Sequence, residues 1–130
     1  MNGVKYLLDT NIIIGLLKDV SEVVAIIAES DISPNECAYS GITRVELLGF
    51  SEMDAGQEQG IVSILSAMNY LPFDRDVENA AIRLRRTTNL KLPDAIIAAT
   101  AEIHGLNLLS LDRALCAAVV KARKSDKATP

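Results

Sequence analysis

The apolar run over residues 6–14 is interrupted by one carboxylate, Asp9, which begins the polar triplet Asp9-Thr10-Asn11. Residues 4–8 are apolar at most positions and lack an alternating polar face, which predicts a short, buried strand. Residues 12–17 favour a helix. We therefore expect the triplet at a strand-to-helix junction. In parallel α/β sheets such junctions form the carboxyl edge, where ligands bind.

Asp9 also has a simpler interpretation, because Asp, Thr and Asn are all good helix N-caps. A cap of this kind stabilises a helix by about 1 kcal/mol and requires no chemistry. The functional interpretation of Asp9 therefore depends on which other polar residues reach the same edge.

The rest of the chain alternates between helical and strand-like patterns, without an internal repeat or a low-complexity linker. Apolar spacing predicts helices over residues 21–30, 42–50, 57–68, 74–88, 93–104 and 113–120. Short strands are expected over 37–39, 70–73 and 106–111. This alternation favours a parallel sheet with helices on both faces. We expect a single domain over 1–122 and a polar, frayed tail over 123–130.

Composition limits the classes of protein that the chain can represent. Its 130 residues, 49% of them apolar, suffice for one globular domain. No apolar run is long enough to cross a membrane, and the N-terminus lacks signal-peptide architecture, so we expect a cytoplasmic protein without membrane contact. Cys37, Cys116 and the one histidine, His104, make a zinc site or a Cys–His or Ser–His–Asp hydrolase improbable.

The net charge of −4 argues at first against a nucleic-acid partner, since such proteins are usually basic. If four of the 17 acidic side chains share one site, however, the remaining 13 balance the 13 basic side chains. A divalent cation in that site would reduce the local negative charge further.

Four acidic residues fall where the carboxyl edge is expected: Asp9, Glu46, Asp94 and Asp112. Each has an individual alternative: Asp94 as a partner of a helix dipole, Asp112 as a cap, and Glu46 as a solvated residue. Carboxylates gathered at one edge repel one another and raise each other's pKa values. A fold tolerates this most easily when a hard cation binds there.

Oxygen-only donors suit Mg²⁺ or Mn²⁺ with retained water. A cation held in this way can activate water and stabilise an in-line displacement at phosphorus, which favours phosphodiester hydrolysis. Asn11 and Ser110 are candidates for orienting the ligands or the water. Ordinary turn and cap hydrogen bonding explains these two residues equally well.

At these residues the chain resembles the PIN-domain ribonucleases, and most closely the VapC toxins of toxin–antitoxin pairs. The matching segments are LLDTN at 7–11, SGITRVEL at 40–47, LPDAIIAATA at 92–101 and LSLD at 109–112. Each segment is a weak signal alone, but the four occur in the family's order and span most of the chain.

The resemblance implies a three-layer α/β/α sandwich and metal-dependent cleavage of RNA. It places the family's catalytic acids on Asp9, Glu46, Asp94 and Asp112, and we assign the metal to Asp9, Asp94 and Asp112. Ser110 stands where the family often has Thr, so a hydroxyl is kept. The resemblance also implies an antitoxin partner and a homodimer; an apolar surplus on several helices favours the dimer as well.

Arg83 and Arg86 precede Asp94 and are candidates for RNA contacts, with a solvated helix face as the alternative.

The main functional alternative for the whole chain is a receiver-type or other non-nuclease α/β binding or signalling domain. A receiver domain needs an acid pair after its first strand and a Lys after its last; this chain has Asp9-Thr10-Asn11 and Asp112 there. A phosphatase of the haloacid dehalogenase class needs a second Asp at the position of Asn11, and a PIN fold used only for binding would not need all four acids.

Overall fold

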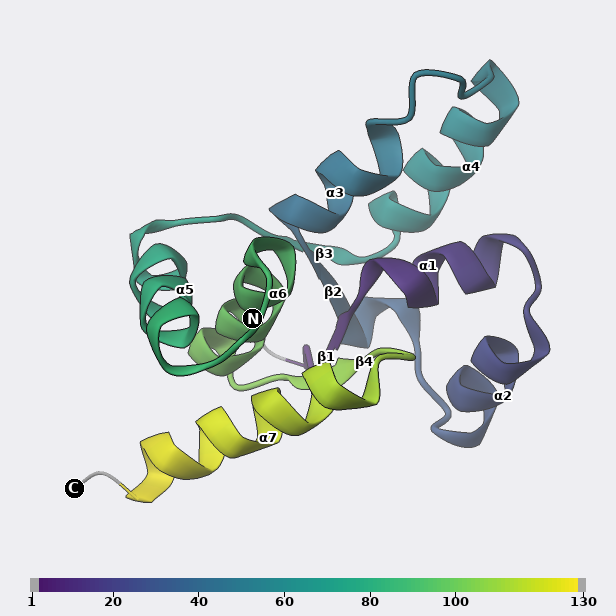
Figure 1. Cartoon of the computed structure of the whole chain (residues 1–130). Coiled ribbons are helices and arrows are strands. Elements are labelled where there is room, and N and C mark those ends of the chain that lie inside the picture. Colours follow the sequence, from purple (N-terminus) through teal and green to yellow (C-terminus); the bar gives the residue numbers. More distant parts are fainter. Residues whose placement is uncertain (1–2, 129–130) are drawn as a thin grey trace.

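A computed structural model of the chain describes residues 3–128, with side chains described through residue 124. Its centre is a sheet of four parallel strands in the order β3-β2-β1-β4 (Figure 1). The strands are short: β1 (Tyr6–Leu8), β2 (Cys37–Ser40), β3 (Asn69–Leu71) and β4 (Asn107–Leu109). The expected parallel sheet is therefore confirmed.

Seven α-helices connect the strands within the described residues: α1 (Thr10–Leu17), α2 (Ser21–Glu29), α3 (Gly41–Leu48), α4 (Ala55–Ser66), α5 (Arg75–Thr87), α6 (Leu92–His104) and α7 (Arg113–Ala128). A short 3-10 helix, Pro34–Glu36, precedes β2. Every strand and helix predicted from the sequence has a counterpart, with boundaries shifted by one to three residues in most cases.

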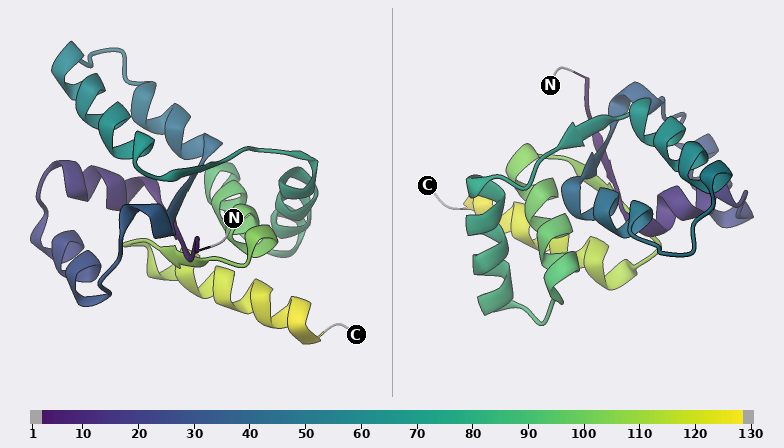
Figure 2. Two further views of the ribbon diagram at one scale, coloured as in Figure 1. Left: turned by 180° about the vertical axis from the view of Figure 1, so that it is seen from behind. Right: turned by 90° about the horizontal axis from the view of Figure 1, so that it is seen from above.

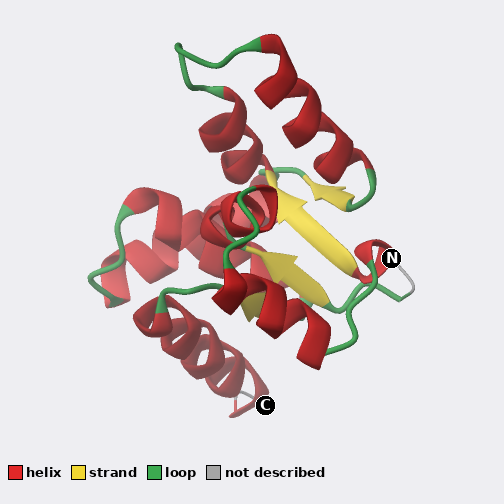
Figure 3. Ribbon diagram, turned by 90° about the vertical axis from the view of Figure 1, so that its right-hand side faces the viewer, coloured by secondary structure: helices red, strands yellow, loops and turns green. Residues whose placement is uncertain are grey.

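Alternate residues of the strands divide the core into two layers, as the two-residue period of a strand requires. Leu7 belongs to the cluster formed with α5, α6 and α7, whereas Leu8 belongs to the cluster formed with α1 to α4. Figure 3 shows the strands between these two groups of helices. The predicted three-layer α/β/α sandwich is thus confirmed. The α3–α4 pair projects from the body of the molecule (Figures 1 and 2).

Helix α6 lies at the centre of one layer and positions a candidate acid. Seven of its residues are buried, from Ala95 to Ala101, which fits its nearly continuous apolar sequence. Pro93 lies in its first turn, and Gly105, with φ +64°, ends it in the left-handed conformation that glycine adopts easily.

Among the described residues, no helix is both long and apolar enough to span a membrane.

The C-terminal helix is longer than predicted. Apolar spacing predicts a helix that ends at residue 120 and a frayed tail after it, but α7 runs through Ala128; residues 129–130 lie outside the described part. Its last turns contain Lys, Arg and Ala, which are good helix formers, and glycine is absent from them. Arg123 also fixes this segment, donating hydrogen bonds to the Leu106 carbonyl (3.3 Å) and to Asn107 Oδ1 (3.0 Å).

Gly15 allows the close approach of α1 to α2, so we expect Gly15→Ala to destabilise the fold. A Cβ at this position would lie 2.4 Å from Val23 Cγ2, and Val23 is fully buried. Overpacking of this kind costs about 1–3 kcal/mol. Gly60→Ala is the matched control, because its Cβ would meet only Leu17 Cδ2, at 3.6 Å. That change should stabilise α4 by up to about 1 kcal/mol. Urea unfolding measures both; equal effects would contradict the packing argument.

Candidate active site

The register of the sheet brings the segments that follow β1 and β4 together at the carboxyl edge. Leu8 of β1 pairs with Leu109 of β4, so the residues that follow them, Asp9 and Ser110, are neighbours. The Asp9 amide continues the ladder by donating to the Leu109 carbonyl at 3.0 Å. Sheet pairing therefore places the first candidate acid beside the Ser110–Asp112 segment.

The carboxylate of Asp9 is only 8% exposed and accepts three hydrogen bonds. Its Oδ1 accepts from the Thr10 amide at 2.8 Å, which caps α1. Its Oδ2 accepts from the Ser110 hydroxyl at 2.7 Å and from Asn11 Nδ2 at 3.3 Å. The capping interpretation is thus correct for one oxygen, while two neighbouring polar side chains orient the other.

Asn11 and Ser110 connect the β1–α1 junction to the β4–α7 junction. Asn11 Nδ2 donates to Ser110 Oγ at 3.2 Å, and Asn11 Oδ1 accepts from the Leu111 amide at 3.1 Å. Ser110 Oγ also accepts from the Asp112 amide at 3.0 Å. Both residues therefore contact groups around Asp9, where the sequence analysis expected them to act.

Asp112 and Asp94 reach the edge from two different helices. Asp112 caps α7, with its Oδ1 accepting from the Leu115 amide at 3.1 Å. Asp94 lies in the first turn of α6 and is partly buried. The N-terminus of each helix favours a negative charge at this position.

The electrostatics of Asp94 link all four acids. Burial raises the pKa of the Asp94 carboxyl, and the charges of Asp9, Asp112 and Glu46 raise it further, in that order. Lys91, at the start of α6, opposes this increase. The other three acids predicted from the sequence thus each act on Asp94.

Glu46 is held by a contact that sequence analysis missed. Thr10 Oγ1 lies 2.8 Å from Glu46 Oε1 and 3.1 Å from Thr43 Oγ1. Thr43 is fully buried, three residues before Glu46 on α3. A threonine at the first position of a helix is an ordinary sequence feature, and its partners lie 33 and 36 residues away.

The donor set is suitable for a hard divalent cation, because every candidate ligand is a carboxylate oxygen and their mutual repulsion is evident at Asp94. Within the described residues, no three His, Cys, Asp or Glu side chains form a ready-made metal cluster. The carboxylates would therefore have to turn toward a common point when a cation binds.

Arg83 and Arg86, the candidate RNA contacts, lie on α5. Arg83 forms an ion pair with Glu102 of α6, whose side chain is only 3% exposed. Glu102 and Asp94 are eight residues apart, about 12 Å along the helix axis. Arg86 is exposed. Arg83 therefore joins two helices, whereas Arg86 faces solvent, and a role of either in RNA binding stays a prediction.

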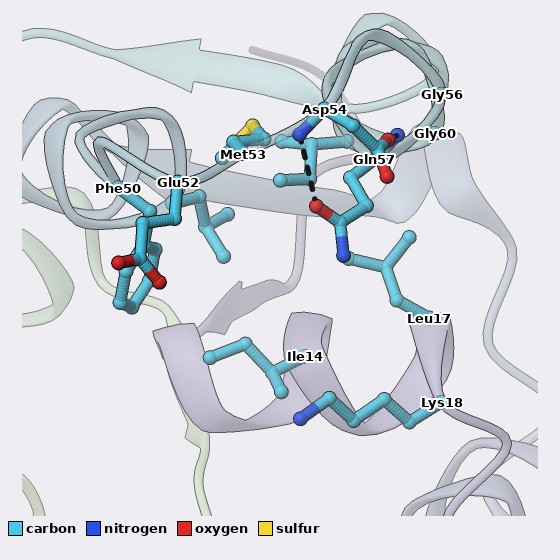
Figure 4. Close-up of a pocket in the computed structure, with 12 residues that line it drawn as sticks. Ile14, Leu17, Lys18, Phe50, Glu52, Met53, Asp54, Gly56, Gln57 and Gly60 are labelled. Carbon is cyan, nitrogen blue, oxygen red and sulfur yellow. Dashed lines mark hydrogen bonds between the residues drawn. The ribbon is translucent and has the colours of Figure 1, made fainter.

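A groove of about 800 Å³ lies between α1 and the α3–α4 pair (Figure 4). Ile14, Leu17, Phe50 and Met53 supply much of its apolar lining. Its polar lining includes Glu52 and Asp54, and the Asp54 amide donates to Gln57 Oε1 at 3.1 Å. Helices α1 and α3 follow the strands at the candidate site, so the groove adjoins the elements that carry Thr10 and Glu46.

Comparison with known proteins gives one family and several similar structures. Residues 6–121 match the model of the PIN domain. A toxin–antitoxin complex from Klebsiella pneumoniae contains a chain with 35% identity and a TM-score of 0.71, covering 83% of this chain and 87% of that one. FitAcB from Neisseria gonorrhoeae matches with 27% identity and a TM-score of 0.70, covering 88% and 93%.

VapBC2 from Rickettsia felis, bound to a promoter DNA fragment, matches with 19% identity and a TM-score of 0.68, covering 84% of this chain and 89% of that one. At this identity the likeness shows the fold alone. The search of curated proteins finds no match.

The raised pKa of Asp94 makes metal-free stability depend on pH, so we expect Asp94→Asn to raise the melting temperature at pH 7 in EDTA. The unfolded carboxyl titrates near about 3.9, below the folded pKa. The ionised group therefore destabilises the parent progressively as pH rises through this interval, and the benefit of Asn disappears as pH falls below it. Thermal unfolding of both proteins between about pH 3 and 7 measures this difference.

Asp76→Asn is the control, since it removes the same charge from an exposed residue in the first turn of α5, the position that Asp94 has in α6. Its melting temperature should not rise above that of the parent across the pH range. An equal gain from both substitutions would indicate a general effect of net charge and would contradict repulsion at the site.

Proposed function

The chain belongs to the PIN-domain family, and from this premise we propose that it is a metal-dependent endoribonuclease acting as the toxin of a toxin–antitoxin pair. The observation that carries the proposal is the gathering of four carboxylates at one sheet edge, where the charges of Asp9, Asp112 and Glu46 raise the pKa of Asp94. Its similarity to a toxin–antitoxin complex at 35% identity supports the biological role.

In the proposed reaction Asp9, Asp94 and Asp112 would hold Mg²⁺ or Mn²⁺. When bound, the ion supplies an activated water and stabilises the charge that develops on the phosphate. The Ser110 hydroxyl and the Asn11 amide keep Asp9 Oδ2 in a fixed direction, at 2.7 and 3.3 Å. Groups that orient ligands in this way commonly affect metal affinity or activity by about 10- to 100-fold. Glu46 is the fourth carboxylate at this edge, and we do not assign it as a metal ligand.

A receiver-type signalling domain is the alternative that the sequence analysis kept open. Such a domain needs an acid pair after its first strand, where this chain has Asp9-Thr10-Asn11, and Asp9 Oδ2 accepts hydrogen bonds from Ser110 and Asn11. Asp112, which caps α7, stands after the last strand, where a receiver domain needs Lys. Labelling by acetyl phosphate would favour this alternative, and RNA cleavage without labelling would exclude it.

The proposal includes a protein partner, an antitoxin, as in the similar complexes. The groove between α1 and the α3–α4 pair offers an apolar surface with charged groups of both signs beside it, Lys18, Glu52 and Asp54, which suits an amphipathic segment. Inhibition of cleavage by the product of a neighbouring small gene would support this partner.

A homodimer and a cytoplasmic location stay predictions. Exposed apolar side chains such as Val45 and Leu92 favour the dimer, and sedimentation would decide it.

We expect the purified protein to cleave single-stranded RNA with Mg²⁺ or Mn²⁺ and to stop when EDTA is added. Asp94→Asn should lower the rate by at least about 10-fold, because the change removes a proposed ligand. Asp19→Asn, an exposed position beyond the C-terminal end of α1, is the control and should retain the parental rate. Gel analysis of labelled RNA measures the reaction. Parental cleavage by the Asp94→Asn protein at saturating metal would refute the proposed metal site.

Arg86 is the better test of RNA contacts, because substitution of Arg83 would also remove its ion pair with Glu102. In a cleavage-deficient Asp94→Asn background, we expect Arg86→Ala to weaken RNA binding. The logarithmic salt dependence should become shallower by about 0.7, the value for one phosphate contact on a single strand. Arg75→Ala, at the other end of α5, is the matched control, because the ion pair of Arg75 with Glu78 is exposed and contributes little to stability. Unchanged affinity and slope would assign Arg86 to solvated surface.

A further inference from the structure

Thr10 is the residue through which two of the four acids are joined. Its backbone amide donates to Asp9 Oδ1 at 2.8 Å, and its hydroxyl lies 2.8 Å from Glu46 Oε1. The first contact is formed by the backbone and is independent of the side chain. The second requires a hydroxyl, so the side chain of Thr10 acts on Glu46 specifically.

The direction of the hydrogen bonds follows from counting protons. An ionised carboxylate only accepts hydrogen bonds, and a hydroxyl has one proton to donate. Thr10 therefore donates to Glu46 Oε1 and accepts, at 3.1 Å, from the hydroxyl of Thr43. Because Thr43 is fully buried, its hydroxyl lies in a packed environment and orients that of Thr10. The result is a chain of two hydroxyls that ends on a carboxylate.

Glu46 needs such a contact more than the other acids do. Asp9, Asp94 and Asp112 are short side chains at or near helix N-termini, which restrict their positions. Glu46 lies on an exposed face of α3, with more rotatable bonds and with negative charges nearby. Without a partner, repulsion and side-chain entropy would both favour its turning into solvent. A hydrogen bond to an ionised acceptor is about twice as strong as a neutral one and opposes that movement.

We propose that Thr10 is a positioning residue for Glu46, oriented by Thr43, and that it holds this carboxylate at the acidic edge for RNA cleavage. This inference rests on the proposed function for its kinetic consequence, though not for its geometry. Threonine suits the position because its branched Cβ limits χ1 and so fixes the hydroxyl more firmly than serine would.

The test compares Thr10→Val, which keeps the shape and removes the hydroxyl, with Thr10→Ser, which keeps the hydroxyl. For Thr10→Val we expect kcat to fall by about 10-fold or more, while KM and the Mn²⁺ dissociation constant stay within about 2-fold of the parent. Mn²⁺ binding, followed by electron paramagnetic resonance, is independent of turnover. Thr10→Ser should recover most of the rate. Equal rates in Thr10→Val and the parent would overturn the proposal, as would a lost rate that serine does not restore.

A double-mutant cycle tests whether Thr10 acts through Glu46. In a Glu46→Gln background, Thr10→Val should cause little further loss of rate, because its target is already altered. Full additivity of the two effects would contradict the proposal. Thr43→Val offers a second variant if Thr10→Val folds poorly. Thr43→Val should also lower kcat, by a smaller factor than Thr10→Val does. A parental rate would show that Thr43 does not orient Thr10.

Crystal structures of the parent and the Thr10→Val variant separate this inference from the proposed function. If the parent fails to cleave any RNA, the proposed activity is wrong. The position of Glu46 still decides the inference in that case. A Glu46 carboxylate that turns away from Asp9 in the variant supports positioning by Thr10, and one that keeps its place overturns it.

Discussion

Repulsion among carboxylates at one edge of the sheet is the interaction that the surrounding structure has to accommodate. Three of the four acids lie at or near the N-terminus of a helix: Asp9 at α1, Asp94 at α6 and Asp112 at α7. Helix N-termini carry partial positive charge and unpaired amide donors, so each favours the ionised carboxylate. Glu46 lies in the second half of α3 and depends on a side-chain hydroxyl instead.

The fold was predictable from sequence because its signals are local. The polar triplet that begins at Asp9 marked the end of β1 and the start of α1, and Gly105 marked the end of α6. The continuous apolar character of α6 identified a central helix. The four candidate acids followed from the same reasoning, because residues that follow parallel strands meet at one edge. The PIN-domain match then agreed with the resemblance based on those segments.

Contacts between distant residues were not predictable in the same way. The pairing of Thr10 with Thr43 and Glu46 depends on how α1 lies against α3. The ion pair of Arg83 with Glu102 likewise depends on the packing of α5 against α6, and the sequence showed only an arginine on an exposed face. The length of α7 was missed for a different reason. A polar composition predicts fraying, but Lys, Arg and Ala are strong helix formers.

The hydrogen bond from Ser110 to Asp9 joins residues 101 positions apart, and β4, which brings Ser110 to the edge, is the last strand to be synthesised. At about 5–20 residues per second, a ribosome needs roughly 5–20 s to make the intervening chain. Throughout that time the first acid exists without the segment that orients it. A nascent chain therefore cannot assemble the complete candidate site before Ser110 has been synthesised.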